Sequence, residues 1–306
     1  KDKDPLGIFA SRLATMACKA AVKGNHQMST QEANMLIDEL KNIARNNGIV
    51  GAGGAGFPAY AKMTEKAYTV ILNCVECEPL LKLHRQLLAT HTEEIIQMLD
   101  EVRESFGAKE AVIGIKSEYV TTIKAIEEVI GDFPNVRICA LKAAYPMGDE
   151  VVLIYEATGR VIKPGGLPID ENVVVYNVET MYNLYRAVHL NIPVTNKLVS
   201  IVGEIDHPLT VRVPLGTTVK EAISLAGKIT VEDPAYVMGG PMMGRLGTEN
   251  TVITKTTNAI IILPKDHHVV VRMEKNLDIE KRRASSSCCQ CRTCTDMCSR
   301  HALGHP

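Results

Sequence analysis

Residues 68–79 read Tyr-Thr-Val-Ile-Leu-Asn-Cys-Val-Glu-Cys-Glu-Pro. Tyr68 to Leu72 form an apolar run of strand length, and the polar loop Asn73 to Pro79 follows directly. Loops at the carboxyl ends of parallel strands are where α/β folds bind ligands. Further strands are expected at Ala111–Ile115, Val136–Leu141 and Val173–Tyr176, with helices at Thr92–Phe106 and Thr121–Ile130. Strands and helices that alternate in this way predict a mostly parallel sheet covered by helices, over about residues 49–195.

The regions on either side of this α/β pattern differ from it. Towards the N-terminus, helical spacing runs from Ile8 to about Lys23, and Ser29 with Glu32 forms a capping-box pattern for a helix that ends near Gly48. After Pro193 the elements become shorter and richer in β-structure, which predicts a compact α+β module. Its expected elements are strands at Val199–Val202, Val211–Val213 and Ala259–Leu263 and a helix near Val219–Ala226.

Composition excludes several classes of function. The chain has 306 residues, of which 46% are hydrophobic, so it can bury a core in about two domains. Lys and Arg number 34 against 35 Asp and Glu, which leaves no basic excess for a nucleic acid. No apolar run approaches the roughly 18 residues of a membrane span, and no signal-peptide pattern is visible. We therefore expect a cytoplasmic protein without a nucleic-acid partner or a membrane span.

Five of the nine cysteines lie between residues 288 and 298. Cys288, Cys291, Cys294 and Cys298 have the C-x2-C-x2-C-x3-C spacing of bacterial two-cluster ferredoxins, with Ser299 where proline is usual. This spacing predicts a 4Fe-4S cluster, and a structural zinc site is the alternative. The second cysteine run of such ferredoxins is absent before Pro306. We therefore expect a truncated ferredoxin-like segment with at most a labile cluster, poorly ordered from about Ser285 when no cluster is bound.

Two loops of the α/β region are candidates for binding. The run Gly51-Ala-Gly-Gly-Ala-Gly-Phe-Pro58, followed by Lys62, would let backbone N–H groups approach a phosphate or a flat ring, although a plain tight turn remains an alternative. In the second loop, Cys74 and Cys77 form a C-x-x-C pair, for which a redox disulfide is a minor alternative because two glutamates would raise the thiol pKa. Cys18 and Cys139 are expected to be buried small hydrophobes.

These stretches together resemble one family. The glycine loop with Lys62, Asn73–Pro79, Tyr145–Glu150 and Asn177–Thr180 are similar to the FMN and NADH site of the complex I 51 kDa subunit family. The resemblance is greater to two relatives within it, the C subunits of Rnf complexes and the PduS-type cobalamin reductases of propanediol utilisation. Shared with these relatives are Gly165–Pro168, Gly239–Gly244 and Thr254–Asn258, and the span Leu198 to about Gly247 resembles their soluble-ligand-binding β-grasp module.

This resemblance implies a domain order. Residues 42–196 would form a Rossmann-like parallel-sheet α/β domain that binds FMN and NADH, and residues 197–268 a small α+β β-grasp domain with its following strand. Residues 269–306 would be the Cys-rich, ferredoxin-like segment.

The resemblance also implies the cofactors and their contacts. FMN would be held noncovalently, with its phosphate near the glycine loop, Lys62, Asn177 and Thr180, and with Asn73 and Glu76 nearer the ring and the ribityl chain. NADH would stack on the flavin, and Glu78 and Glu150 are candidates for contacts to its ribose. The full expected cofactor-binding set is Gly51, Gly53, Gly54, Gly56, Phe57, Lys62, Asn73, Glu76, Glu78, Tyr145, Gly148, Glu150, Asn177 and Thr180.

The function implied is oxidation of NADH through FMN, with electrons passed to iron–sulfur clusters and then to an acceptor such as cob(II)alamin or an Rnf-type chain. The expected partners are NADH and a redox protein or corrinoid, and docking to a membrane or microcompartment complex is compatible with this. The alternative is a noncatalytic docking or corrinoid-binding module with a degenerate flavin site.

Residues 1–41 carry a different resemblance. Ala17–Asn25 and Met28–Leu40 are similar to the C-terminal domain of the mismatch-repair protein MutL, whose metal-dependent nuclease site includes an Ala-Cys-basic motif. The other motifs of that site are absent here. We interpret this segment as a fusion, a misassembled gene or a short coincidence, and expect no nuclease activity from it.

Overall fold

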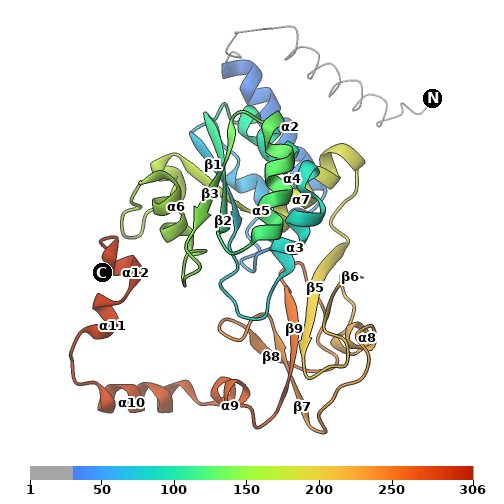
Figure 1. The fold of residues 1–306 in the computed structure, drawn as a ribbon, viewed down its shortest axis with the longest axis vertical. Coiled ribbons are helices and arrows are strands. Elements are labelled where there is room, and N and C mark those ends of the chain that lie inside the picture. The colour runs from blue at the N-terminus through green and yellow to red at the C-terminus, as the bar shows by residue number, and fades with distance from the viewer. Residues whose placement is uncertain (1–29, 306) are drawn as a thin grey trace.

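The computed structural model describes residues 30–305, which form two sheets and a helical C-terminal segment (Figure 1). The first sheet contains β1 (Thr69–Cys74), β2 (Glu110–Lys116), β3 (Val136–Leu141) and β4 (Val173–Asn177). All its strands are parallel, in the order β3-β2-β1-β4. The predicted parallel α/β domain is therefore confirmed, with strand bounds that differ by at most two residues.

Helices bury both faces of this sheet. Val70 and Leu72 of β1 pack towards α2 (Thr30–Asn46), α4 (Thr92–Ser105) and α7 (Val178–Leu190), while Ile71 between them packs towards α6 (Glu150–Thr158). Figure 1 shows α6 across the sheet from α4 and α7. Burial on both faces explains why the strands are continuous apolar runs rather than alternating patterns. The first face is completed by α3 (Leu83–Thr90) and α5 (Val120–Val129).

The second sheet is mixed. Its strands are β5 (Asn196–Gly203), β6 (Leu209–Pro214), β7 (Pro234–Met238), β8 (Arg245–Gly247) and β9 (Ala259–Pro264), in the order β6-β5-β9-β7-β8. Only β5 and β9 pair in parallel, and the other pairs are antiparallel. Helix α8 (Val219–Ser224) packs its apolar face on this sheet. The predicted α+β module is confirmed.

The C-terminal segment folds back towards the first sheet. It leaves β9 through α9 (His268–Glu274) and α10 (Leu277–Ser287) and returns through α11 (Thr293–Asp296) to α12 (Ser299–Ala302), beside α6 (Figure 1). Arg300 of α12 forms a forked ion pair with Asp149, the N-cap of α6, with Nη2 at 2.6 Å from Oδ2. About half of the described residues from Ser285 on, where we expect poor order when no cluster is bound, are helical, and the far end is anchored to Asp149.

Within the described residues, no helix combines the length and the apolar character that crossing a membrane requires. The MutL-like motif around Cys18 and the capping residue Ser29 lie outside the described residues.

Candidate functional site

The candidate site is a cavity of about 360 Å³ where β1 and β4 end. This volume lies in the range of small-molecule sites, and the carboxyl ends of parallel strands are where α/β folds place them. Eleven of the expected residues line the cavity: Gly51, Gly53, Phe57, Lys62, Asn73, Glu76, Glu78, Gly148, Glu150, Asn177 and Thr180. Gly54, Gly56 and Tyr145 do not line it, and the Tyr145 side chain is 67% exposed.

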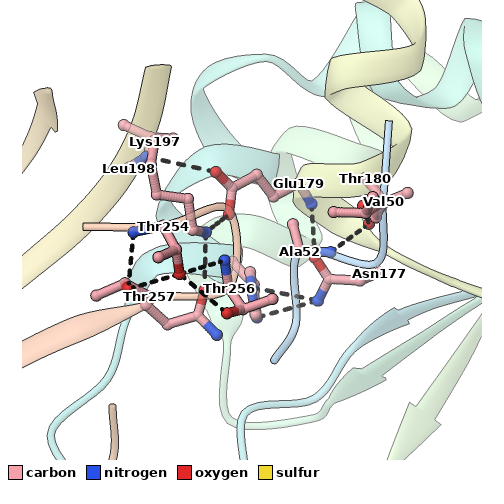
Figure 2. A network of polar contacts seen from close by, with 12 residues as sticks. Val50, Ala52, Asn177, Glu179, Thr180, Lys197, Leu198, Thr254, Thr256 and Thr257 are labelled. Carbon is pink, nitrogen blue, oxygen red and sulfur yellow. Dashed lines mark hydrogen bonds and ion pairs between the residues drawn. The ribbon is translucent and has the colours of Figure 1, made fainter. Parts of the chain in front are cut away.

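The glycine loop is fixed against the start of α7. Gly51 N donates to Phe57 O at 2.7 Å, which closes the loop, and Ala52 N donates to the Thr180 hydroxyl at 2.9 Å (Figure 2). Asn177 caps α7 by accepting a hydrogen bond from Glu179 N at 3.0 Å. A Cβ on Gly53 would lie 3.1 Å from the Asn177 amide nitrogen. The loop therefore lies at the positive end of a helix dipole, an arrangement that suits a phosphate.

Two further loops meet at Gly148. The Asn73 side chain accepts from Val75 N and donates to Gly148 O, both at 3.0 Å, while Gly148 N donates to the Cys77 sulfur at 3.2 Å. A Cβ at residue 148 would lie 2.5 Å from Val75 O. Only glycine permits this backbone approach. The motifs around residues 73–79 and 145–150 therefore form one wall of the cavity.

Glu76 is the buried acid of the site. Its side chain is 5% exposed, and one oxygen accepts from His84 N at 2.9 Å. The other oxygen, Oε2, is buried and has no hydrogen-bond partner in the described part of the chain. Burial raises the pKa of Glu76 to about 7, although Arg85, 3.7 Å away, opposes that rise. A buried oxygen that lies 3.7 Å from a guanidinium but accepts no hydrogen bond can accept one from a ligand, so this residue fits a bound polar molecule.

Lys62 and Glu150 face each other across the cavity wall. Lys62 Nζ lies 3.3 Å from Glu150 Oε1 and donates to Val175 O at 3.3 Å, with the Phe57 ring 5.9 Å away. Both side chains are about one-third or more exposed, so this ion pair contributes little to stability and its partners can turn to a ligand.

Glu78 lines the same cavity, but its carboxylate already accepts two hydrogen bonds from the backbone of the second module. Its two carboxylate oxygens accept hydrogen bonds from Met242 N at 2.9 Å and Met243 N at 2.8 Å, in the glycine-rich loop of the second module. The predicted ribose contact of Glu78 would require the release of that loop. The geometry instead makes Glu78 a link between the two modules.

Two of the cavity residues that sequence reasoning did not assign to the site, His84 and Asn258, can form hydrogen bonds with a ligand. His84 is partly buried, desolvation lowers its pKa to about 3, and its ring lies 3.2 Å from the Asn177 amide nitrogen. No sequence motif marked this residue. Asn258, from the second module, also lines the cavity, and it belongs to the Thr254–Asn258 stretch that was noted without a role.

Cys74 and Cys77 do not form a disulfide in this structure. All cysteines in the described residues are free thiols, and burial raises the pKa of Cys74 well above its ordinary value. A thiol that resists ionisation is a poor redox nucleophile, so the C-x-x-C interpretation is not supported. Cys139 is only half-buried, which corrects the expectation of a buried hydrophobe.

The four cysteines of the ferredoxin-like run are exposed. Across residues 37–305, no three His, Cys, Asp or Glu side chains lie close enough to hold a metal ion, so the thiols are not gathered as cluster ligands in this arrangement. Hydrogen bonds from Thr293 lower the pKa of Cys291 to about 7.

Comparison with known proteins agrees with this geometry. Residues 44–186 match the model of the Nuo51 FMN-binding domain, and residues 198–246 match the SLBB domain. The chain is 39% identical over 279 residues to the cobalamin reductase PduS of Salmonella typhimurium, covering 91% of this chain and 61% of the relative. It is 30% identical to the C subunit of the Na+-translocating ferredoxin:NAD+ oxidoreductase complex of Acetobacterium woodii, covering 88% and 59%. The chain thus spans about three-fifths of the length of these curated relatives.

A solved structure shares the fold. An NAD+-reducing NiFe-hydrogenase in its H2-reduced state superimposes with a TM-score of 0.63 at 19% identity, over 88% of this chain and 52% of that one. Together the two domain matches and the curated relatives confirm the resemblance seen in the sequence. The chain is similar in sequence to PduS cobalamin reductases and to Rnf-type C subunits, and its residues 44–186 and 198–246 match a Nuo51 FMN-binding domain and an SLBB domain in that order.

Proposed function

We propose that this chain is an electron-transfer oxidoreductase that binds FMN in the cavity at the ends of β1 and β4 and accepts electrons from NADH. The observation that carries the proposal is the buried Glu76 oxygen Oε2, which accepts no hydrogen bond within the described residues and has Arg85 Nε at 3.7 Å, in a cavity whose glycine loop lies at the start of α7. This combination of an anion-binding end and a polar ring-binding end fits a flavin mononucleotide. The match to an FMN-binding domain supports the same assignment.

Residues at different positions in the cavity would contact different parts of the flavin. The glycine loop, Asn177 and Thr180 would hold the phosphate, with Lys62 supplying positive charge, while Asn73 and Glu76 would contact the ribityl chain and ring. Bound FMN supplies the chemistry by taking a hydride as an electron pair and returning the electrons singly. Glu150, exposed at the cavity edge and released from Lys62, is the candidate contact for the NADH ribose.

The test separates binding from reduction. Purified protein should retain about one FMN per chain, identified by mass spectrometry of the extracted flavin, and anaerobic NADH should bleach the visible flavin absorbance. Glu150→Ala should slow the bleaching by NADH and leave that by dithionite unchanged. Protein without flavin, and unable to take up FMN, would refute the proposal. Loss of both reductions in Glu150→Ala would show that the site itself had been damaged.

The electron acceptor is a further part of the proposal. We propose that Cys288, Cys291 and Cys294 bind a labile 4Fe-4S cluster after rearrangement, with Cys298 as the ligand that such a run directs to a second cluster. We further propose that electrons continue to a corrinoid or a redox protein, as the names of the relatives suggest. The spacing of the cysteines supports this. Anaerobic reconstitution should incorporate iron and sulfide in equal amounts, and Cys291→Ser should lower both. Equal iron content in the variant would exclude the run as the ligand set.

The alternative is a docking or corrinoid-binding module without flavin chemistry. A second cavity, of about 380 Å³, lies against β7 and β8 and includes Tyr236, Glu249 and Lys265. If this cavity alone were functional, a corrinoid would bind to protein that takes up no FMN.

A further inference from the structure

The stretch Thr254–Asn258 of the second module forms a rigid turn against the glycine loop of the first. Thr254 N donates to the Thr257 hydroxyl at 3.1 Å, and the hydroxyls of Thr254 and Thr256 lie 3.1 Å apart (Figure 2). Lys255 donates to Gly48 O before the glycine loop, and a Cβ on Gly56 would lie 3.0 Å from the Thr256 methyl group. The turn therefore contacts the glycine loop region on both sides.

Asn258 at the end of this turn is oriented by a buried cation. Lys197 at the start of β5 is 2% exposed, forms an ion pair with Glu179 of α7, and donates to Asn258 Oδ1 at 2.8 Å. An ammonium group has only donors, so the Asn258 atom that faces it must be the oxygen. The amide nitrogen is therefore left for another acceptor, and it has no hydrogen-bond partner within residues 37–305.

The place of this amide indicates which part of a ligand it meets. Lys197 contacts both Asn258 and Glu179. Glu179 lies in the first turn of α7, directly before Thr180, whose hydroxyl accepts the Ala52 N–H. Asn258 thus lies at the α7 end of the cavity, with the glycine loop. Among the described residues of the second module, Asn258 is the one that lines the cavity, so its amide N–H2 is available to a ligand at this end.

We propose that Asn258 donates its amide N–H to the phosphate of bound FMN, with Lys197 as the positioning residue, so that the second module completes the flavin site. This inference rests on the proposed function. It assigns a ligand-binding role to a residue outside the span of the FMN-binding domain, residues 44–186.

Flavin titrations followed by quenching of flavin fluorescence test the assignment. Asn258→Ala should weaken FMN binding about tenfold or more, as expected for a hydrogen bond to a charged group, and leave the affinity for riboflavin, which lacks the phosphate, within about twofold. Asn258→Asp keeps the contact with Lys197 but presents an oxygen to the phosphate. Its loss of FMN affinity relative to riboflavin affinity should therefore be larger than that of Asn258→Ala. Asn250→Ala, an exposed asparagine of the same module, is the matched control.

The outcomes are distinct. Wild-type protein that binds no FMN would refute the proposed function and this inference with it. Wild-type binding with unchanged FMN affinity in Asn258→Ala, or an equal loss for FMN and riboflavin, would refute the inference alone.

A double variant tests the positioning role of Lys197. In Lys197→Met with Glu179→Leu the buried charges are removed together, so the fold should persist while Asn258 loses its orienting donor. We expect the FMN-to-riboflavin affinity ratio to fall towards one, with the melting temperature near that of wild type. A wild-type ratio in this variant would show that Lys197 does not position the amide.

Discussion

Glu76 shows how one residue can serve binding at a cost to stability. One oxygen of its buried carboxylate accepts a hydrogen bond from His84 N, while Oε2 accepts none in the described part of the chain and lies 3.7 Å from Arg85 Nε. Burial without full pairing disfavours the charged form, which is why its pKa rises from 4.5 to about 7. Such groups cluster at functional sites, and this one lies in the proposed flavin cavity.

The first prediction concerns the pH dependence of stability. An acid whose pKa is higher in the folded than in the unfolded state stabilises the fold below pH 4.5 and loses that contribution as the pH rises through about 7. Glu76→Gln removes the titration. Its free energy of unfolding, relative to wild type, should therefore rise between about pH 5 and pH 8, by up to about 3 kcal/mol. Urea denaturation without added flavin, at both pH values, measures this, and a pH-independent difference would contradict it.

Gly148 is a residue that the close packing of two loops requires. A Cβ there would lie 2.5 Å from Val75 O and 2.9 Å from the Cys77 sulfur. The second prediction is that Gly148→Ala pushes the loops apart, lowers the free energy of unfolding by about 1–3 kcal/mol and weakens FMN binding. Gly131→Ala, where a Cβ would meet nothing within 4 Å, is the control and should change stability by less than about 0.5 kcal/mol. Equal effects of the two changes would contradict the steric argument.

At the scale of elements, the strands could be predicted and the helices around the site could not. The strands β1 to β4 are apolar runs such as Val70–Leu72, so their pattern is unambiguous. Helix α7 was missed although its sequence is amphipathic, and nearly all its residues are buried, polar ones such as Glu179 and Asn183 included. Its start, Asn177–Thr180, was recognised only through the resemblance.

The residues of the site were predictable where they lie in local motifs. Gly51, Gly53 and Lys62 belong to one loop and line the cavity as expected. Asn258 could not be assigned, because its place depends on the pairing of β5 with β9, about 60 residues apart in sequence, which brings Lys197 beside it. Gly54 was expected at the ligand but has φ +127 and open space around it, so its role is to allow the turn.

The third prediction concerns the junction of α7 and β5. Lys197→Met alone leaves the Glu179 carboxylate buried and unpaired, which should cost about 3–5 kcal/mol of unfolding free energy. The double variant with Glu179→Leu should recover most of this loss, because replacing both charges with apolar side chains is often nearly neutral. Chemical denaturation of the two single variants and the double variant measures the coupling. Additive losses would show that the pair does not act as a unit.

At the scale of the whole molecule, the two modules share one site. The second module contributes Asn258 to the cavity, and its loop at Met242 and Met243 is held by Glu78 of the first. A Cβ on Gly240 would lie 2.1 Å from the Glu78 carboxyl carbon. The contact between Glu78 and the loop Gly239–Gly244 therefore requires glycine at residue 240. A ligand or redox partner that moves one module relative to the other would therefore act on the proposed flavin site directly.

The last prediction separates the two roles that Glu78 could have. Glu78→Ala removes two charge-assisted hydrogen bonds, so amide exchange at Met242 and Met243 should become about tenfold faster or more, while exchange in β5 and β9 stays at the wild-type rate. Hydrogen–deuterium exchange with mass spectrometry measures this, with Glu232→Ala, an exposed acid of the second module, as the control. If Glu78 instead served mainly as a contact to the NADH ribose, the variant would slow flavin reduction by NADH and leave exchange in the loop unchanged. That result would show the link between the modules to be dispensable, because the loop would hold its place without the carboxylate.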